Sequence, residues 1–161
     1  MRRIVILLIL QIIATGFCFG QLPHTFTQYT SEDGLSQNTI MSILQDDKGV
    51  MWFATWDGLY KFDGYTFNNY KAHPGDSIGL SNNRLDNIKE DRYGYIWVQS
   101  YNHQVYRFNP RLERFQAIPY DNYLSLDMYV LPCGDVWIIT VQNELIHIST
   151  HPETHEMKAT D

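Results

Sequence analysis

The chain has 161 residues, of which 44% are hydrophobic and 19% are charged, and its net charge at pH 7 is −6. This composition supplies a buried core and argues against an intrinsically disordered chain. The negative charge and the lack of a basic run argue against nucleic acid and against an anionic membrane surface as partners. Aromatic residues are frequent, with 11 Tyr, 8 Phe and 4 Trp, and such side chains favour half-buried β-strands.

The first 20 residues have the pattern of an export signal. Arg2 and Arg3 are followed by the predominantly apolar run Ile4–Ala14 and then by small residues up to Gly20. This is the three-part layout of a secretory signal peptide. A transmembrane anchor is the alternative, but the run is shorter than the roughly 20 residues that a span requires. We therefore predict a signal helix over residues 1–20, cleavage after Gly20 and export of the mature chain.

An internal repeat organises the rest of the chain. Eight residues recur 45 positions later: Gly34, Leu35, Ser36, Asn38, Ile43, Asp46, Gly49 and Trp52 match Gly79, Leu80, Ser81, Asn83, Ile88, Asp91, Gly94 and Trp97. A third, shorter copy follows 40 positions after the second and places Met128, Gly134 and Trp137 at the Ile, Gly and Trp positions. A period of 40 to 45 residues around Gly-x-x-Trp lies in the range of β-propeller blades.

Within each copy, short apolar runs alternate with tight turns. Strands are expected at 40–45, 50–55, 59–62 and 65–70, then at 86–90, 95–100, 105–108 and 114–118, and finally at 127–131, 136–140 and 145–148. The predicted fold is therefore all-β, a partial β-propeller of about three four-stranded antiparallel blades. Residues 21–33 are expected to add a strand to a blade from elsewhere, 34–78 and 79–122 to form blades one and two, 123–150 a partial third blade, and 151–161 a tail.

The repeated glycine and tryptophan are predicted to form the structural core of the blades. A single blade cannot bury both of its faces, so each blade needs a neighbour. We expect the indole of each copy to fill the gap between adjacent blades, which favours packing over the alternative of ligand stacking. The residues in question are Gly49, Gly94, Gly134, Trp52, Trp97 and Trp137.

The segment Trp52–Gly64, which reads WFATWDGLYKFDG, resembles the repeat of the two-component regulator propeller family. The preceding Asp33–Ser36 extends this resemblance. The later copies depart from the pattern, because Gln104 and Glu144 stand where the first copy has Gly58, and the second copy has one extra residue in this loop. Those two loops are therefore predicted to adopt another backbone geometry.

The resemblance implies the N-terminal periplasmic sensor part of a Bacteroidetes-type hybrid two-component histidine kinase. In such receptors many blades form two propellers, a kinase follows beyond the inner membrane, and a ligand that is often a glycan fragment changes how two subunits of a homodimer pack. About three blades do not close a ring, since propellers use four to eight. We therefore expect this chain to be a fragment whose partners are the remaining blades of a longer receptor.

The loop after each tryptophan strand is the predicted place for ligand recognition. Trp56 and Asp57 in the first copy correspond to Tyr101 and Asn102 in the second, where His103 is added. Aromatic faces beside polar side chains suit a sugar, so we expect an oligosaccharide ligand here. Ordinary loop residues without a binding role are the alternative.

No catalytic residue, cofactor or metal site is predicted. His147, His151 and His155 are spaced four apart, but Pro152 disfavours the helix that would bring them together. The paired aspartates all lie in predicted turns, where hydrogen bonding to the local backbone accounts for them.

The sequence thus predicts a non-enzymatic, periplasmic ligand-sensing segment of a hybrid two-component sensor kinase, responding to a glycan. Two alternatives stay open. In the first alternative the segment is a propeller scaffold that binds a protein partner, and in the second it is a secreted propeller-fold polysaccharide lyase or hydrolase.

Overall fold

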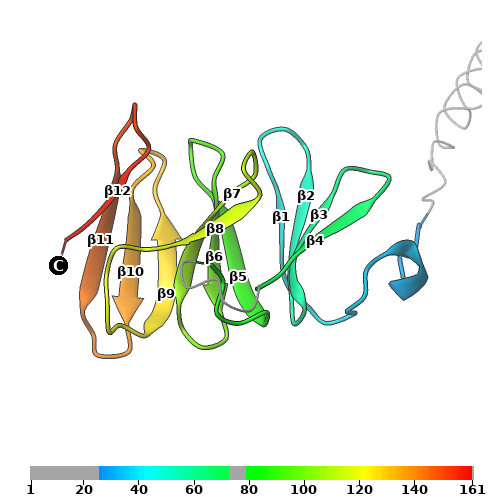
Figure 1. Cartoon of the computed structure of the whole chain (residues 1–161), viewed down its shortest axis with the longest axis horizontal. Helices are drawn as coiled ribbons and strands as arrows, with labels where there is room; N and C mark the ends of the chain where they lie inside the picture. Colours follow the sequence, from blue (N-terminus) through cyan, green and yellow to red (C-terminus); the bar gives the residue numbers. More distant parts are fainter. Residues whose placement is uncertain (1–25, 73–78, 161) are drawn as a thin grey trace, which may run out of the picture.

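The computed structural model describes residues 26–72 and 79–160, and these fold into β-strands with one short 3-10 helix, η1 (Ser31–Asp33) (Figure 1). Three four-stranded antiparallel sheets follow one another along the described chain, each with its strands in sequence order. The first blade contains β1 (Ile40–Gln45), β2 (Met51–Thr55), β3 (Gly58–Phe62) and β4 (Phe67–Tyr70). The second contains β5 (Leu85–Glu90), β6 (Ile96–Ser100), β7 (Val105–Asn109) and β8 (Arg114–Ala117). The third contains β9 (Ser125–Val130), β10 (Val136–Thr140), β11 (Leu145–Thr150) and β12 (Met157–Thr160).

The structure differs from the sequence prediction at both ends of the part of the chain that it describes. The tail predicted over 151–161 is wrong, because β12 pairs antiparallel with β11 and completes the third blade. The strand predicted over 21–33 is not formed by residues 26–33. There the chain makes η1, with Thr30 as its N-cap. The predicted signal helix over residues 1–20 lies outside the described residues.

An aspartate carboxylate closes the turn before the tryptophan strand in two of the blades. Asp46 accepts two backbone N–H groups of its own turn through Oδ1, at 2.8 and 3.0 Å, and the indole Nε1–H of Trp52 through Oδ2, at 2.9 Å. Asp91 repeats this arrangement and accepts the indole N–H of Trp97 at 2.8 Å. In the third blade Leu131 occupies the same place in the turn and offers no carboxylate. The carboxylate therefore links turn geometry to the position of the indole in the first two blades.

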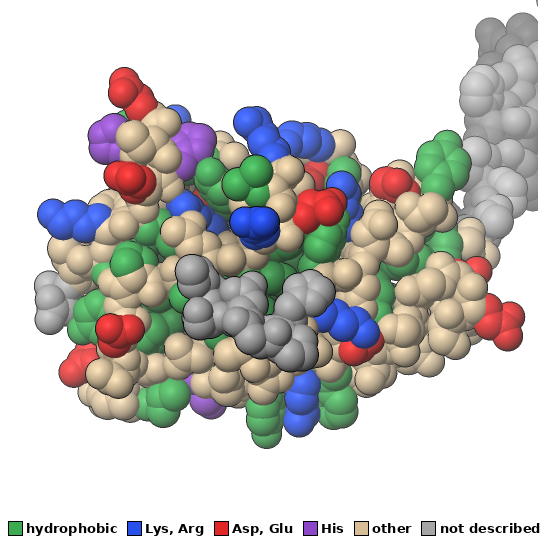
Figure 2. Space-filling model, in the orientation of Figure 1, with side chains coloured by type: hydrophobic (Ala, Val, Ile, Leu, Met, Phe, Trp, Pro, Cys, Tyr) green, Lys and Arg blue, Asp and Glu red, His purple; other side chains and the backbone are tan. Residues whose placement is uncertain are grey.

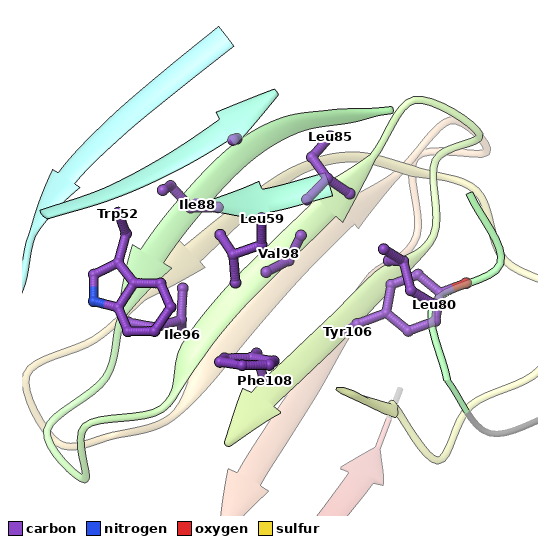
Figure 3. Close-up of a cluster of buried hydrophobic side chains, with 10 residues drawn as sticks. Trp52, Leu59, Leu80, Leu85, Ile88, Ile96, Val98, Tyr106 and Phe108 are labelled. Carbon is purple, nitrogen blue, oxygen red and sulfur yellow. The ribbon is translucent and has the colours of Figure 1, made fainter. Parts of the chain in front are cut away.

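These two indoles lie in the gaps between successive blades. Trp52 is 1% exposed, and its ring centroid lies 5.7 Å from that of Phe108, on β7 of the second blade (Figure 3). Trp97 is fully buried in a second cluster with Met128 and Ile138 of the third blade. Burial of so large a side chain stabilises the fold by several kcal/mol. The blades are therefore held together chiefly by apolar contact across their faces.

The outer faces of the first and third blades have no such cover among the described residues. Ile43 of β1 is 59% exposed, whereas its repeat counterpart Ile88 in β5 is 4% exposed. Trp137 is half-buried, and its ring stacks on His147 of the adjacent strand at 4.4 Å. The same repeat position is thus buried or exposed according to whether a blade lies against it.

This difference gives a direct test of the packing. We expect Trp97→Ala to lower the free energy of unfolding by roughly 3–5 kcal/mol, because it leaves a cavity between two blades. Trp137→Ala removes the same side chain from a half-exposed face and is expected to cost only about 1–2 kcal/mol. Urea unfolding followed by far-UV circular dichroism measures both. Equal losses in the two variants would contradict the proposed role of the inter-blade gap.

Candidate functional site

The loops that follow the tryptophan strands all lie at one edge of the molecule (Figure 1). The first blade uses the two-residue connection 56–57, and the second and third use the three-residue connections 101–103 and 141–143. The extra residue in the longer loops is accommodated by left-handed backbone, at His103 (φ 63°) and Asn143 (φ 63°). In the first blade Gly58 has the positive φ, at 114°. The predicted change of loop geometry between the copies is therefore confirmed.

The structure brings Trp56 and Tyr101 together through a third residue, Arg84. The guanidinium carbon of Arg84 lies 4.2 Å from the ring centroid of Trp56 and 4.1 Å from that of Tyr101. Both rings are partly exposed, at 42% and 52%. A cation between two aromatic faces is stabilised by the quadrupoles of both rings. The stack joins the first blade to the second at the edge that carries the loops.

Asp57 forms its contacts inside the first blade. Its Oδ2 accepts hydrogen bonds from Ser36 Oγ (2.8 Å) and Lys71 Nζ (2.6 Å), and the hydroxyl of Ser36 also bonds to that of Tyr60. Partial burial alone raises the pKa of Asp57, but the hydrogen bonds from Lys71 and Ser36 and the charge of Lys71 outweigh it and hold the pKa below its ordinary value. Asp57 is therefore ionised at neutral pH and fixes the loop, while its role in recognition stays a prediction.

Asn102 takes the corresponding place in the second blade. Its side-chain amide donates to Ser81 Oγ (3.1 Å) and accepts from Ser100 Oγ (2.6 Å), and Ser81 bonds to the hydroxyl of Tyr106 at 2.6 Å. The next residue, His103, reaches the third blade, with its Nδ1 2.9 Å from the backbone oxygen of Ser125. Both side chains are exposed as well as hydrogen-bonded. Their predicted role in ligand binding is neither supported nor opposed by these contacts.

Arg84 is the residue that sequence reasoning missed. It stands directly before β5, and its backbone oxygen accepts the N–H of Tyr101 at 2.8 Å, so the β5–β6 pairing places the two residues side by side. The β5–β6 register could have been predicted from the sequence, because it follows from pairing the strand before the Asp-x-x-Gly turn with the strand after it. The contact with Trp56 could not, since it depends on how two blades pack.

The three histidines of the third blade make separate contacts. Nε2 of His147 lies 3.0 Å from Oδ2 of Asp135, and Nδ1 of His155 lies 3.0 Å from the hydroxyl of Tyr95. Nδ1 of His151 accepts the backbone N–H groups of Glu153 and Thr154, each at 3.3 Å. Across residues 26–72 and 79–160, no three His, Cys, Asp or Glu side chains are grouped so as to hold a metal ion. In the same two segments no helix has the length and apolarity needed to cross a membrane.

Comparison with known proteins identifies the repeat. Residues 34–57 match the family model of the two-component regulator propeller. A stretch of 56 residues, 35% of this chain and 4% of the relative, is 48% identical to Histidine kinase P4 of Formosa agariphila. The chain carries the two-component regulator propeller repeat. The predicted resemblance to this repeat is thereby confirmed over residues 34–57.

Solved structures agree on the fold. The extracellular domain of a hybrid two-component system of B. thetaiotaomicron matches 84% of this chain with a TM-score of 0.65 and 24% identity, over 20% of its own chain. Virginiamycin B lyase from Staphylococcus aureus matches 83% of this chain with a TM-score of 0.55 and 14% identity, over 43% of its own chain. At these identities the likeness is one of fold, and the predicted partial β-propeller is confirmed. The chain spans less than half the length of each of these relatives.

The geometry of the first loop makes Gly58 a sensitive position. A Cβ added there would lie 2.5 Å from the backbone oxygen of Tyr70, in addition to the strain of a positive φ. We expect Gly58→Ala to lower the free energy of unfolding by about 2–5 kcal/mol. Gly64 (φ 99°) has open space at the same point, so Gly64→Ala should cost about 1–2 kcal/mol from backbone strain alone. Thermal unfolding compares the two, and an equal loss would show that the close approach to Tyr70 has no energetic consequence.

Proposed function

We propose that this chain is a non-catalytic, periplasmic sensing segment of a hybrid two-component sensor histidine kinase. In this proposal it binds an oligosaccharide at the edge formed by the β2–β3 and β6–β7 loops. The repeat match at residues 34–57, the relative named a histidine kinase and the fold shared with an extracellular receptor domain support the sensor assignment. The kinase, the inner-membrane location and the homodimer belong to the proposed receptor as a whole.

The observation that carries the ligand assignment is the pair of exposed rings, Trp56 and Tyr101. They come from consecutive blades, yet both are fixed by stacking on the same guanidinium. Rings held in place before binding lose little conformational entropy when a ligand stacks on them. Sugar rings present apolar C–H faces that stack on aromatic rings, and the polar groups of the neighbouring loops lie within reach of their hydroxyls.

The remaining blades of the receptor are the natural partners of the two open blade faces. Ile43 is exposed and Trp137 is half-buried on those faces, whereas their repeat counterparts are buried between blades. Because the ligand edge runs across a blade junction, a bound oligosaccharide would favour one spacing of the two blades. A change in that spacing is the proposed origin of the signal that the dimer transmits.

The test is oligosaccharide binding by the exported chain, measured by isothermal titration calorimetry against neutral and acidic tetrasaccharides, with chromatography of the sugar afterwards. We expect saturable binding with no change in the sugar. Trp56→Ala and Tyr101→Ala should each weaken binding about tenfold, the effect of removing one stacking face. Tyr65→Ala is the matched control, because Tyr65 is exposed but lies in the β3–β4 turn at the opposite ends of the strands.

Three outcomes would contradict the proposal. Cleavage of the sugar would favour the lyase or hydrolase alternative, and absence of binding to any tetrasaccharide would favour the protein-binding scaffold. Equal weakening by Tyr65→Ala would remove the assignment of the site to this edge.

A further inference from the structure

Arg84 has a charge that no described residue neutralises. The ion pairs among the described residues join Lys71 to Asp57 and His147 to Asp135, and neither involves Arg84. Its Nε is buried without a hydrogen-bond partner. This buried Nε–H is costly, since it has left water without gaining an acceptor. Neither Nη atom of Arg84 is among the buried atoms that lack a partner, so the Nη edge of the guanidinium is the part that an anion can reach.

The stacking leaves that edge available. The guanidinium carbon lies over the rings of Trp56 and Tyr101, 4.2 and 4.1 Å from their centroids. The donors of a guanidinium lie in its plane and form a fork that matches the two oxygens of a carboxylate or the oxygens of a sulfate. In Figure 2 a positively charged side chain lies between hydrophobic ones along the edge that carries these loops.

The repeat shows that the fold does not need an arginine here. The corresponding residue of the third blade is Leu124, whose backbone oxygen accepts the N–H of Val141 at 2.9 Å, as that of Arg84 accepts the N–H of Tyr101 at 2.8 Å. The junction of the second and third blades thus forms with an aliphatic residue at this position and another in place of Tyr101. The stack of Arg84 with its two rings is therefore particular to the junction of the first and second blades, and blade packing alone does not require it.

We propose that Arg84 binds a negatively charged substituent of the ligand, so that the ligand is an acidic oligosaccharide bearing carboxylate or sulfate groups. The two rings stack on sugar faces on either side while the guanidinium takes the anionic group between them. This inference rests on the proposed function and narrows its ligand class. The chain as a whole has a net charge of −6, so long-range electrostatic attraction does not favour anions. Recognition of the anionic group must therefore come from direct hydrogen bonds to the guanidinium of Arg84.

The experiment compares three probes by calorimetry at a fixed ionic strength: tetragalacturonate, its neutral methyl ester, and a sulfated κ-carrageenan tetrasaccharide. We expect at least one anionic probe to bind at least about tenfold more tightly than the methyl ester, the gain expected from a charge-assisted bidentate contact. The two anionic probes separate carboxylate from sulfate as the recognised group.

Arg84→Leu is the decisive variant, because the third blade carries leucine at this position. It should lose that preference, and it should weaken binding of the methyl ester to a smaller extent, because Trp56 and Tyr101 lose the cation on which they stack. Arg111→Leu, an equal change of charge at an exposed residue in the β7–β8 turn, is the control and should keep the preference. If Arg84→Leu does not fold, Arg84→Lys tests the same point, since it keeps the charge and loses the fork, and should retain only part of the preference.

The outcomes separate this inference from the proposed function. Equal binding of the neutral and anionic probes, or equal losses in Arg84→Leu and Arg111→Leu, overturns the acidic ligand and leaves sugar sensing in place. Failure of all three probes to bind overturns both.

Discussion

The structure depends on the burial of one indole ring between each pair of neighbouring blades. A four-stranded sheet has two faces, and a chain of blades is stable only where one face meets the next. Trp52 and Trp97 provide that contact, and an aspartate of the preceding turn fixes each ring by accepting its N–H. Because the same carboxylate also accepts two backbone N–H groups of its turn, turn geometry and inter-blade packing are set by a single side chain.

The candidate site is a consequence of this packing. Arg84 and Tyr101 are neighbours within the second blade, and Trp56 meets Arg84 only because the first two blades lie face to face. The backbone N–H of Gly58 donates to the oxygen of Asn83 at 2.8 Å, which fixes the first loop against the start of the second blade. In the proposed function, a ligand that binds across this junction would couple its binding to the spacing of the two blades.

Much of the fold was predictable because its signals are local. The glycine turns and the alternation around each tryptophan place the strands of the three sheets to within one or two residues. The last strand was missed because a polar turn with a proline precedes it, although Met157 and Ala159 alternate with Lys158 and Thr160 as in a half-buried strand. The expected strand near Phe26 is not formed, since a capping box at Thr30 and Asp33 favours the 3-10 turn. The stacking of Arg84 on Trp56 could not be predicted from the sequence, because it depends on how two blades pack against each other.

Hydrogen exchange of the four indole N–H groups, followed by NMR with each resonance assigned through a Trp→Phe substitution, tests the central claim most directly. The account predicts slow exchange at Trp52 and Trp97, whose N–H groups are buried between blades and bonded to Asp46 and Asp91. It predicts fast exchange at the exposed Trp56 and at Trp137, which lacks a blade against it. Similar rates for all four groups, or fast exchange at Trp97, would contradict it.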